Sequence, residues 1–319
     1  MAKEFLTLVD WAKRTGPDGS ISRRIVERMA IVDPIWEEIP FTPANDGWDH
    51  LVVFRTAIPE PYWTAIGEGA PFTASQTDQV KEGIGFCESW IQVPKRLADK
   101  SGDKVEFLKS EALAHSQGFS KLLERTLFYG NRKADPKQFH GLAPRFNDLS
   151  MDNVLDAGGT GSNLTSLWLA VWGQKTGYGI FPEEGKPTVK LGKAKETEAE
   201  DQSGRLYQVY RQHMEWGGGL AIEDPRYFVR IANIDLSADP ANTDLDELII
   251  DASFIPPDLD GKAMWMGNRQ LIAYLTKVAK AQPNLALSWE EAYGRRIPSL
   301  WGVPLHRVEA IINTESQVA

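Results

Sequence analysis

The clearest pattern in the chain covers residues 103–130, where apolar side chains recur at steps of three and four residues. This spacing places them along one face of a long helix. Asp103 is suited to cap the first turn together with Glu106, and Gly130 to end the helix in the left-handed conformation. We predict a helix on the order of 40 Å long, of a kind also typical of enzyme cores. Its apolar face consists of Leu108, Ala112, Phe119, Leu122, Leu123 and Leu127.

Two shorter amphipathic helices are predicted near the start of the chain, over residues 5–12 and 21–32. Glycine and proline residues separate them, and the chain is expected to run extended through Pro34, Pro40 and Pro43. Such short segments do not form a domain alone. They pack either on the same subunit or on a neighbouring one.

Residues 48–58 are rich in β-branched and aromatic side chains and predict a strand, whose partner we expect at residues 83–93. About two dozen residues lie between them, and loops of this length usually serve binding. They include Tyr62, Trp63 and Phe72. Because a two-stranded arm is marginally stable alone, we expect these aromatic side chains to lie on another molecule. The alternative is an active-site lid.

Strands and turns alternate in the next part of the chain. A glycine-rich turn at residues 156–163 leads into a buried segment that ends at Trp172. The charged, apolar-poor residues 188–204 predict a solvated hairpin or loop. Residues 205–216 resume strand character, and we expect the glycines at 217–219 to turn the chain.

The pattern after this turn predicts mainly helices. Asp224 and Pro225 open a predicted helix whose inward face would carry Phe228, Ile231 and Ile234. Three further elements are expected: a helix over 244–253, a strand over 262–266, and a helix capped by Asn268 and ended by Pro283.

Composition sets the outer limits. With 319 residues the chain is expected to form two lobes, and its 42% hydrophobic and 25% charged fractions are ordinary for a soluble protein. No apolar run approaches the roughly 18 residues that span a membrane, and the first residues do not resemble a signal peptide. A net charge of −9 argues against a surface that grips duplex DNA. The single cysteine, Cys87, excludes an internal disulfide and fits a reducing compartment.

The search for catalytic chemistry gives no site. Gly158, Gly159 and Gly161 lack the spacing of nucleotide-binding loops. His213 and Glu215 alternate on one predicted strand, so both could face one metal ion, but no third ligand is evident. A polar strand face is the simpler interpretation. We therefore assign no catalytic, cofactor-binding or metal-binding residue.

Two other reactive residue types have structural interpretations. His115 lies on the long predicted helix, where a partly buried core residue or an interface donor is expected. Cys87 lies beside Phe86 in a predicted strand, which indicates an inert, buried thiol.

Three segments together resemble one protein family. The run 204–235 (GRLYQVYRQHMEWGGGLAIEDPRYFVRIANID) resembles the central segment of major capsid proteins of tailed double-stranded DNA bacteriophages, of the short-tailed type. Residues 260–269 (DGKAMWMGNR) and 302–315 (GVPLHRVEAIINTE) agree in content and order. The resemblance covers nearly the whole chain.

The resemblance implies an α+β fold, the one shared by tailed-phage and herpesvirus major capsid proteins. It implies that the long helix is the spine of a peripheral domain, joined by strands that include residues 308–314. The expected parts are an N-terminal arm (1–45), an extended loop (46–95), the peripheral domain (96–130), an axial domain (131–286) and a return to the peripheral domain (287–319).

The resemblance also implies a structural function. Such proteins form pentamers and hexamers and build the icosahedral shell that encloses the phage genome. The implied partners are copies of the chain itself, a scaffolding protein, a portal protein, in some cases decoration proteins, and packaged DNA without specific contact. No membrane and no cofactor is implied. The chain would be located in the virion after assembly in the host cytoplasm. We expect subunit contacts at Phe5, Trp11, Tyr62, Trp63 and Phe72.

Three other functions stay open at this stage. The same fold builds the shells of bacterial nanocompartments that enclose enzymes. A cytoplasmic metal-dependent enzyme would use His213 and Glu215. A soluble adaptor would not assemble. Some capsid proteins crosslink through a lysine and an asparagine, but no motif here matches theirs.

Overall fold

The computed structural model describes residues 35–100, 102–161, 163–183, 189–201, 203–281, 287–292 and 295–319. These residues form two compact units. Unit 1 contains the described parts of Phe86–Glu124 and Pro187–Gly217, and unit 2 contains those of Asp33–Gly85, Arg125–Lys186 and Gly218–Ala319. No helix in the described part of the chain is both long and apolar enough to span a membrane.

Helix α4 (Lys104–Tyr129) confirms the long helix predicted from the sequence. Asp103 Oδ1 accepts hydrogen bonds from the backbone N–H groups of Val105 and Glu106, both at 3.0 Å, so Asp103 caps the first turn as expected. Leu122 is an exception to the predicted buried face because its side chain is 48% exposed.

The rest of unit 1 is built on long strands. Strand β10 (Leu206–Ile222) pairs antiparallel with β8 (Lys190–Leu191) and β9 (Lys195–Glu200), and it neighbours β4 (Gly85–Pro94), which leads into the short helix α3 (Lys95–Lys100). The charged run is mostly exposed, as predicted, but it forms one arm of a hairpin with β10 and not a hairpin within itself.

The predicted turn at residues 217–219 is wrong. Strand β10 continues through these glycines into unit 2, and within that unit Gly219 pairs with Ile180 of β7 (Gly177–Phe181). A Cβ atom on Gly219 would lie 2.9 Å from the carbonyl oxygen of Gly83. Glycine is thus needed here for close backbone packing, and pairing with β7 overrides its tendency to form turns.

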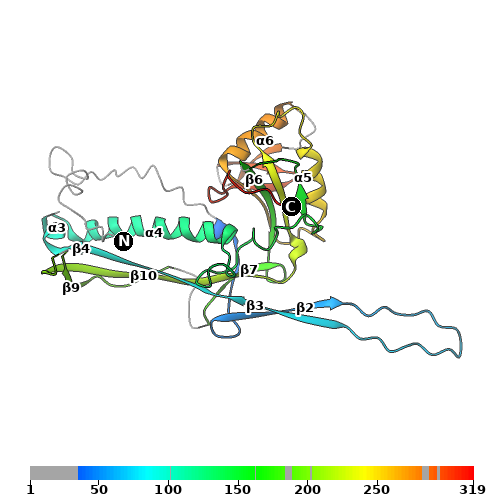
Figure 1. Cartoon of the computed structure of the whole chain (residues 1–319), viewed down its shortest axis with the longest axis horizontal. Coiled ribbons are helices and arrows are strands. Elements are labelled where there is room, and N and C mark those ends of the chain that lie inside the picture. Colours follow the sequence, from blue (N-terminus) through cyan, green and yellow to red (C-terminus); the bar gives the residue numbers. More distant parts are fainter. Residues whose placement is uncertain are drawn as a thin grey trace. The chain divides into compact units, whose positions relative to one another are not determined.

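Unit 2 is organised around a seven-stranded sheet in which β6 (Leu164–Trp172) is an inner strand and wholly buried. Helices α5 (Leu245–Phe254) and α6 (Arg269–Ala281) pack on this sheet (Figure 1). In sheet order the strands are β13 (Leu287–Ala292), β14 (Arg295–Leu300), β15 (Val303–Arg307), β12 (Lys262–Gly267), β6, β11 (Phe228–Asp235) and β5 (Val154–Asp156).

Several predicted elements of this unit are confirmed. Helix α5, strand β12 and helix α6 lie where the sequence placed them. Asn268 Oδ1 accepts a hydrogen bond from the backbone N–H of Leu271 at 2.8 Å, so it caps α6 as expected.

The helix predicted after Pro225 is wrong. Only a single 3-10 turn forms, at Pro225–Tyr227, and the next eight residues are strand β11. This strand lies between β6 and β5 and is buried on both faces. Its apolar residues therefore do not alternate, and the spacing of Phe228, Ile231 and Ile234 imitates a helix.

The C-terminal strand expected at residues 308–314 is also absent from this described segment. The chain there is irregular, and the backbone of Glu315 bridges to Leu164 at the start of β6. Strand β15 pairs in parallel with β12, for example Leu305 with Trp265. The C-terminal residues thus join the seven-stranded sheet rather than a sheet beside α4.

The two units are not continuous in sequence. The described parts of residues 187–217 group with most of the long helix in unit 1, and those of residues 287–319 group with the seven-stranded sheet in unit 2. Strand pairings between segments distant in sequence produce both groupings.

Two smaller groups of strands complete unit 2. Strand β1 (Phe41–Pro43) follows the short helix α2 (Ile35–Glu38) and pairs in parallel with β7. Strand β2 (Asp49–Ala57) confirms the strand predicted there, but its partner is β3 (Gln76–Gly83) rather than residues 83–93. Strand β3 contains Val80 as its one large apolar residue and is mostly exposed, so it lacks the alternation that identifies strands.

Candidate functional site

The β2–β3 hairpin carries the most conspicuous exposed segment of the described chain. Its two strands pair from Asp49 and Gly83 to Ala57 and Gln76. Residues 58–75, which we call the hairpin loop, connect them without a helix or strand, and every one of them is exposed. Figure 1 shows the loop as an irregular continuation of the two-stranded ribbon.

The hairpin loop exposes an unusual amount of apolar surface. Trp63, Ile66 and Phe72 are fully exposed (103%, 109% and 107%), and Ile58 and Tyr62 are more than half exposed. Several large apolar side chains exposed in one loop are typical of sites that bind another protein. The structure thus places three of the predicted contact residues, Tyr62, Trp63 and Phe72, in one exposed loop. Their contact with another subunit stays a prediction.

The base of the hairpin is held by an ion pair between the buried Glu82 and the partly buried Arg145. Arg145 donates to both carboxylate oxygens of Glu82 on β3, from Nη1 at 2.5 Å and from Nη2 at 2.7 Å. Its guanidinium also donates to the backbone carbonyls of Gly141 (3.2 Å) and His140 (3.1 Å). A bidentate pair with these additional bonds is the geometry in which a buried arginine is stabilised.

Apolar packing adds to this anchor. Val52 of β2 and Ile84, directly after β3, join a buried cluster with Tyr178 and Ile180 of β7. On the solvent side, Lys81 forms ion pairs with Asp46 and Asp49, both at 3.1 Å. The hairpin therefore combines a fixed base with an exposed, apolar tip.

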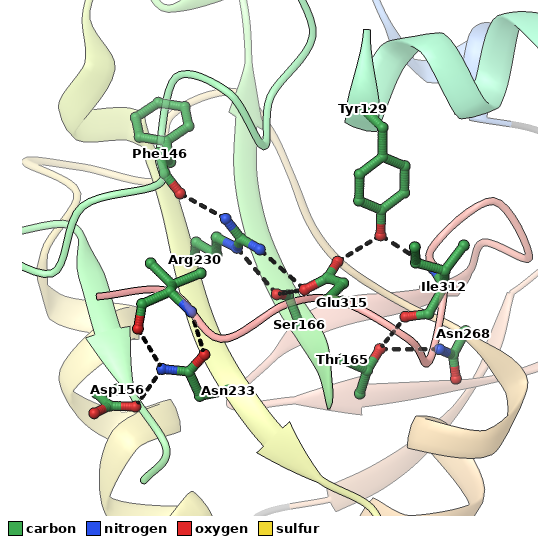
Figure 2. Close-up of polar contacts among 11 residues, drawn as sticks. Tyr129, Phe146, Asp156, Thr165, Ser166, Arg230, Asn233, Asn268, Ile312 and Glu315 are labelled. Atoms are coloured by element: carbon green, nitrogen blue, oxygen red, sulfur yellow. Dashed lines mark hydrogen bonds and ion pairs between the residues drawn. The ribbon is translucent and has the colours of Figure 1, made fainter. Parts of the chain in front are cut away.

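A second polar site lies inside unit 2 and fastens the end of the chain (Figure 2). Arg230 of β11 donates from Nη2 to Glu315 at 2.9 Å, from Nε to Ser166 at 3.0 Å, and from Nη1 to the carbonyl of Phe146 at 2.7 Å. The hydroxyl of Tyr129, at the end of α4, also donates to Glu315. Burial, followed by the charge of Glu315, raises the pKa of Tyr129 well above its usual range.

Two asparagine side chains, Asn233 and Asn268, form hydrogen bonds to the backbone of the C-terminal segment (Figure 2). Asn233 binds the backbone of Val318 in both directions, accepting from its N–H at 2.8 Å and donating to its carbonyl at 3.0 Å. Asn233 has a left-handed φ of 58°, which asparagine tolerates better than most residues. Asn268 donates to Thr165 Oγ1 at 3.1 Å and to the carbonyl of Ile311 at 3.2 Å.

The other predicted contact residues and the candidate metal ligands lie outside the hairpin loop. Phe5 and Trp11 lie outside the described residues. His213 and Glu215 lie on β10 with 3.8 Å between Nδ1 and Oε2. His213 stacks on Trp90, with ring centroids 4.3 Å apart. No group of three or more metal-binding side chains occurs among the described residues.

The two other singled-out residues lie in unit 1. The Nδ1 atom of His115 is 2.8 Å from the hydroxyl of Ser89 on β4, and His115 is half-buried, as expected. Cys87 is also half-buried, and burial, with a smaller effect of Glu88, raises the pKa of its thiol.

Sequence reasoning missed both anchoring pairs and part of the loop's apolar surface. Ile58 and Ile66 flank the predicted aromatic residues and could have been identified from their position among prolines and glycines. The partners Arg145 and Glu82 are 63 residues apart. No local pattern signals a pair at such a separation.

Comparison with known proteins identifies the family. The model of the family "Major capsid protein GP7" matches residues 16–319. The solved structure of bacteriophage Epsilon15 contains a chain 35% identical to this one, with a TM-score of 0.79, and the match covers 100% of this chain and 98% of that chain. No curated protein matches the chain.

A more distant structure agrees in fold. A chain of the bacteriophage JBD30 capsid matches with a TM-score of 0.52 over 96% of this chain and 99% of that chain. At 10% identity this likeness concerns the fold alone. The mixed α/β fold expected from the sequence is thus confirmed as that of phage capsid proteins. The chain belongs to the major capsid protein GP7 family, whose members are structural proteins of the icosahedral phage shell and not enzymes.

Proposed function

We propose that the hairpin loop lies over an adjacent subunit and links the pentamers and hexamers of the shell. The observation that carries this proposal is the full exposure of Trp63, Ile66 and Phe72 in a loop whose base is fixed by Arg145 and Glu82. A loop with this composition leaves apolar surface in water unless another molecule covers it.

The free energy expected from burying the aromatic side chains supports the proposed contact with an adjacent subunit. Tyr62, Trp63 and Phe72 would each bury about 150–250 Å². At about 25 cal/mol per Å², the three together contribute on the order of 10 kcal/mol before the costs of ordering and association are subtracted. The net gain at each contact is therefore modest. Many such contacts within one closed shell reinforce each other, and head-to-tail contacts that close by rotation form rings.

We further propose roles for the parts of the chain. Unit 1, with most of α4, corresponds to the peripheral domain, and the seven-stranded sheet with α5 and α6 corresponds to the axial domain. The β2–β3 hairpin is the extended loop, and residues 1–45 are the N-terminal arm, to which Phe5 and Trp11 would contribute subunit contacts.

The proposed partners follow from the family. A scaffolding protein would guide assembly in the host cytoplasm, a portal protein would occupy one vertex, and decoration proteins would bind the finished shell. The net charge of −9 suits a shell that encloses DNA without gripping it.

A photo-crosslinking residue in place of Trp63 tests the loop's position. In assembled shells, illumination is expected to join position 63 covalently to a different subunit, which peptide mass spectrometry identifies. Unassembled subunits at the same concentration are the matched control and should give no joined chains. Shells in which position 63 links only within its own chain, or not at all, would contradict the proposal.

A further inference from the structure

His50, on β2 at the base of the hairpin, is buried in a chain of polar groups. Its Nε2 atom lies 2.8 Å from the hydroxyl of Tyr178 on β7, and that hydroxyl donates to Glu223 at 2.8 Å. A phenol has one proton to donate, and here Glu223 receives it. His50 must therefore donate from Nε2 to the phenol oxygen, which leaves its Nδ1 atom without a proton in the neutral ring.

The Nδ1 atom is the unusual feature of this site. It is buried and has no hydrogen-bond partner among the described residues. A proton added to Nδ1 would therefore create a buried donor and a buried positive charge without a matching acceptor. The nearest register partner of His50 is Glu82 on β3, but both oxygens of Glu82 already bind Arg145.

Burial and the nearby carboxylates shift the pKa of His50 in opposite directions. Burial lowers the pKa of His50, while the charges of Glu223 and Glu82 act in the opposite direction and are the smaller effects. His140 lies near the same ion pair, and burial followed by the charge of Arg145 also lowers its pKa. On the solvent side of the hairpin base, Lys81 and Arg132 face Asp49.

We propose that mild acid loosens the base of the β2–β3 hairpin by protonating His50, and that this regulates how the hairpin loop is presented to a neighbouring subunit. The loosening is a property of the subunit itself. Only the consequence for the neighbour rests on the function proposed above for the loop.

The lowered pKa of His50 determines how the stability of the hairpin base changes with pH. A histidine with a lowered pKa in the folded state contributes its full stabilisation above the unfolded value of about 6.5, and this is lost as the pH falls through the lower folded value. Protonation favours a state in which the ring reaches water. Because Tyr178 and Val52 share one buried cluster at the hairpin base, moving His50 disturbs the packing that holds β2.

Hydrogen–deuterium exchange on unassembled full-length subunits tests the loosening directly. After correction for intrinsic exchange, amides of β2 and β3 are expected to exchange several-fold faster at pH 5.5 than at pH 7.5, with no comparable change in β6. The substitution His50→Gln keeps a donor toward Tyr178 but does not titrate, so it should abolish the acceleration. Unchanged exchange in the wild type, or an undiminished response in His50→Gln, would overturn the proposal.

The substitution His140→Gln is the matched control and should keep the wild-type response. If His140→Gln alone removes the response, the proposal is wrong because the sensor is His140. If His50→Gln does not fold, the NMR titration of His50 in the wild type decides. The acceleration must then develop between the unfolded value of about 6.5 and the titration midpoint of His50 and level off below that midpoint, and an acceleration outside this window overturns the proposal. Shells that form without pH-dependent exchange would contradict this inference alone, whereas pH-dependent exchange without loop-dependent assembly would contradict only the proposed function.

Discussion

Arg230 and Glu315 are 85 residues apart in the chain, yet they form an ion pair of 2.9 Å with side chains only 4% and 5% exposed. The pair joins strand β11 to the C-terminal segment, and Ser166, Tyr129 and the Phe146 carbonyl complete its hydrogen bonds. A buried pair contributes little relative to an apolar replacement of the same shape, but removal of one partner leaves an unpaired charge.

The substitution Arg230→Met should therefore destabilise the subunit strongly. Glu315 would stay buried without its cation, and the expected loss is about 3–5 kcal/mol. Denaturant unfolding of the isolated subunit measures it. Arg226→Ala is the control, because its pair with Asp224 at 2.6 Å leaves the arginine side chain 69% exposed, and exposed pairs contribute about 0–1 kcal/mol. Equal losses in both variants would contradict the role assigned to burial.

Gly130 ends helix α4, but not through a left-handed backbone, because its φ lies outside that region. A Cβ atom there would instead lie 2.5 Å from the carbonyl oxygen of Thr126 and 2.6 Å from that of Phe139. Gly130→Val should lower the yield of folded subunit and its melting temperature, with a loss of about 1–3 kcal/mol or more.

Gly118 provides the comparison within the same helix. A Cβ atom at Gly118 meets nothing within 4 Å, so Gly118→Ala should stabilise the subunit by about 0.5–1 kcal/mol. Thermal unfolding followed by circular dichroism measures both variants. A melting temperature that is unchanged in Gly130→Val would show that the close packing around residue 130 is not required.

Cys87 should react slowly with thiol reagents in the folded subunit. Because burial and Glu88 raise its pKa, less thiolate is present at pH 8 than for a free cysteine, and the thiolate is the reactive form. Its rate of alkylation should lie below that of glutathione and recover on denaturation. Native subunits that react as fast as denatured ones would refute this assignment.

The elements predicted correctly are those whose sequence carries a local signal, such as a capping residue or apolar residues at regular spacing. Helix α4 has a cap at Asp103 and apolar residues at helical spacing, and α6 has its cap at Asn268. Strand β11 has the sequence pattern of a helix because a strand buried on both faces has no alternation of apolar and polar residues. Strand β3 was missed for the opposite reason, since it is mostly exposed.

The candidate sites also differ in whether a local sequence signal identifies them. The aromatic residues of the hairpin loop could be identified from the sequence because prolines and glycines around Trp63 exclude regular structure. The pairs Arg145–Glu82 and Arg230–Glu315, and the position of His50 beside Tyr178, depend on segments brought together across more than 60 residues. Such contacts follow from topology and have no local signature.

The central claim is that the exposed apolar side chains of the hairpin loop drive assembly. The substitution Trp63→Asp tests it against Thr64→Asp, which places the same charge on the neighbouring exposed residue. Both variants are expected to fold and to unfold like the wild type, because neither side chain contributes to the core.

The decisive measurement is sedimentation velocity with negative-stain microscopy of both variants, produced together with the scaffolding protein. The account predicts shells from Thr64→Asp and only small oligomers or monomers from Trp63→Asp. Shells of normal size and number from Trp63→Asp would contradict it.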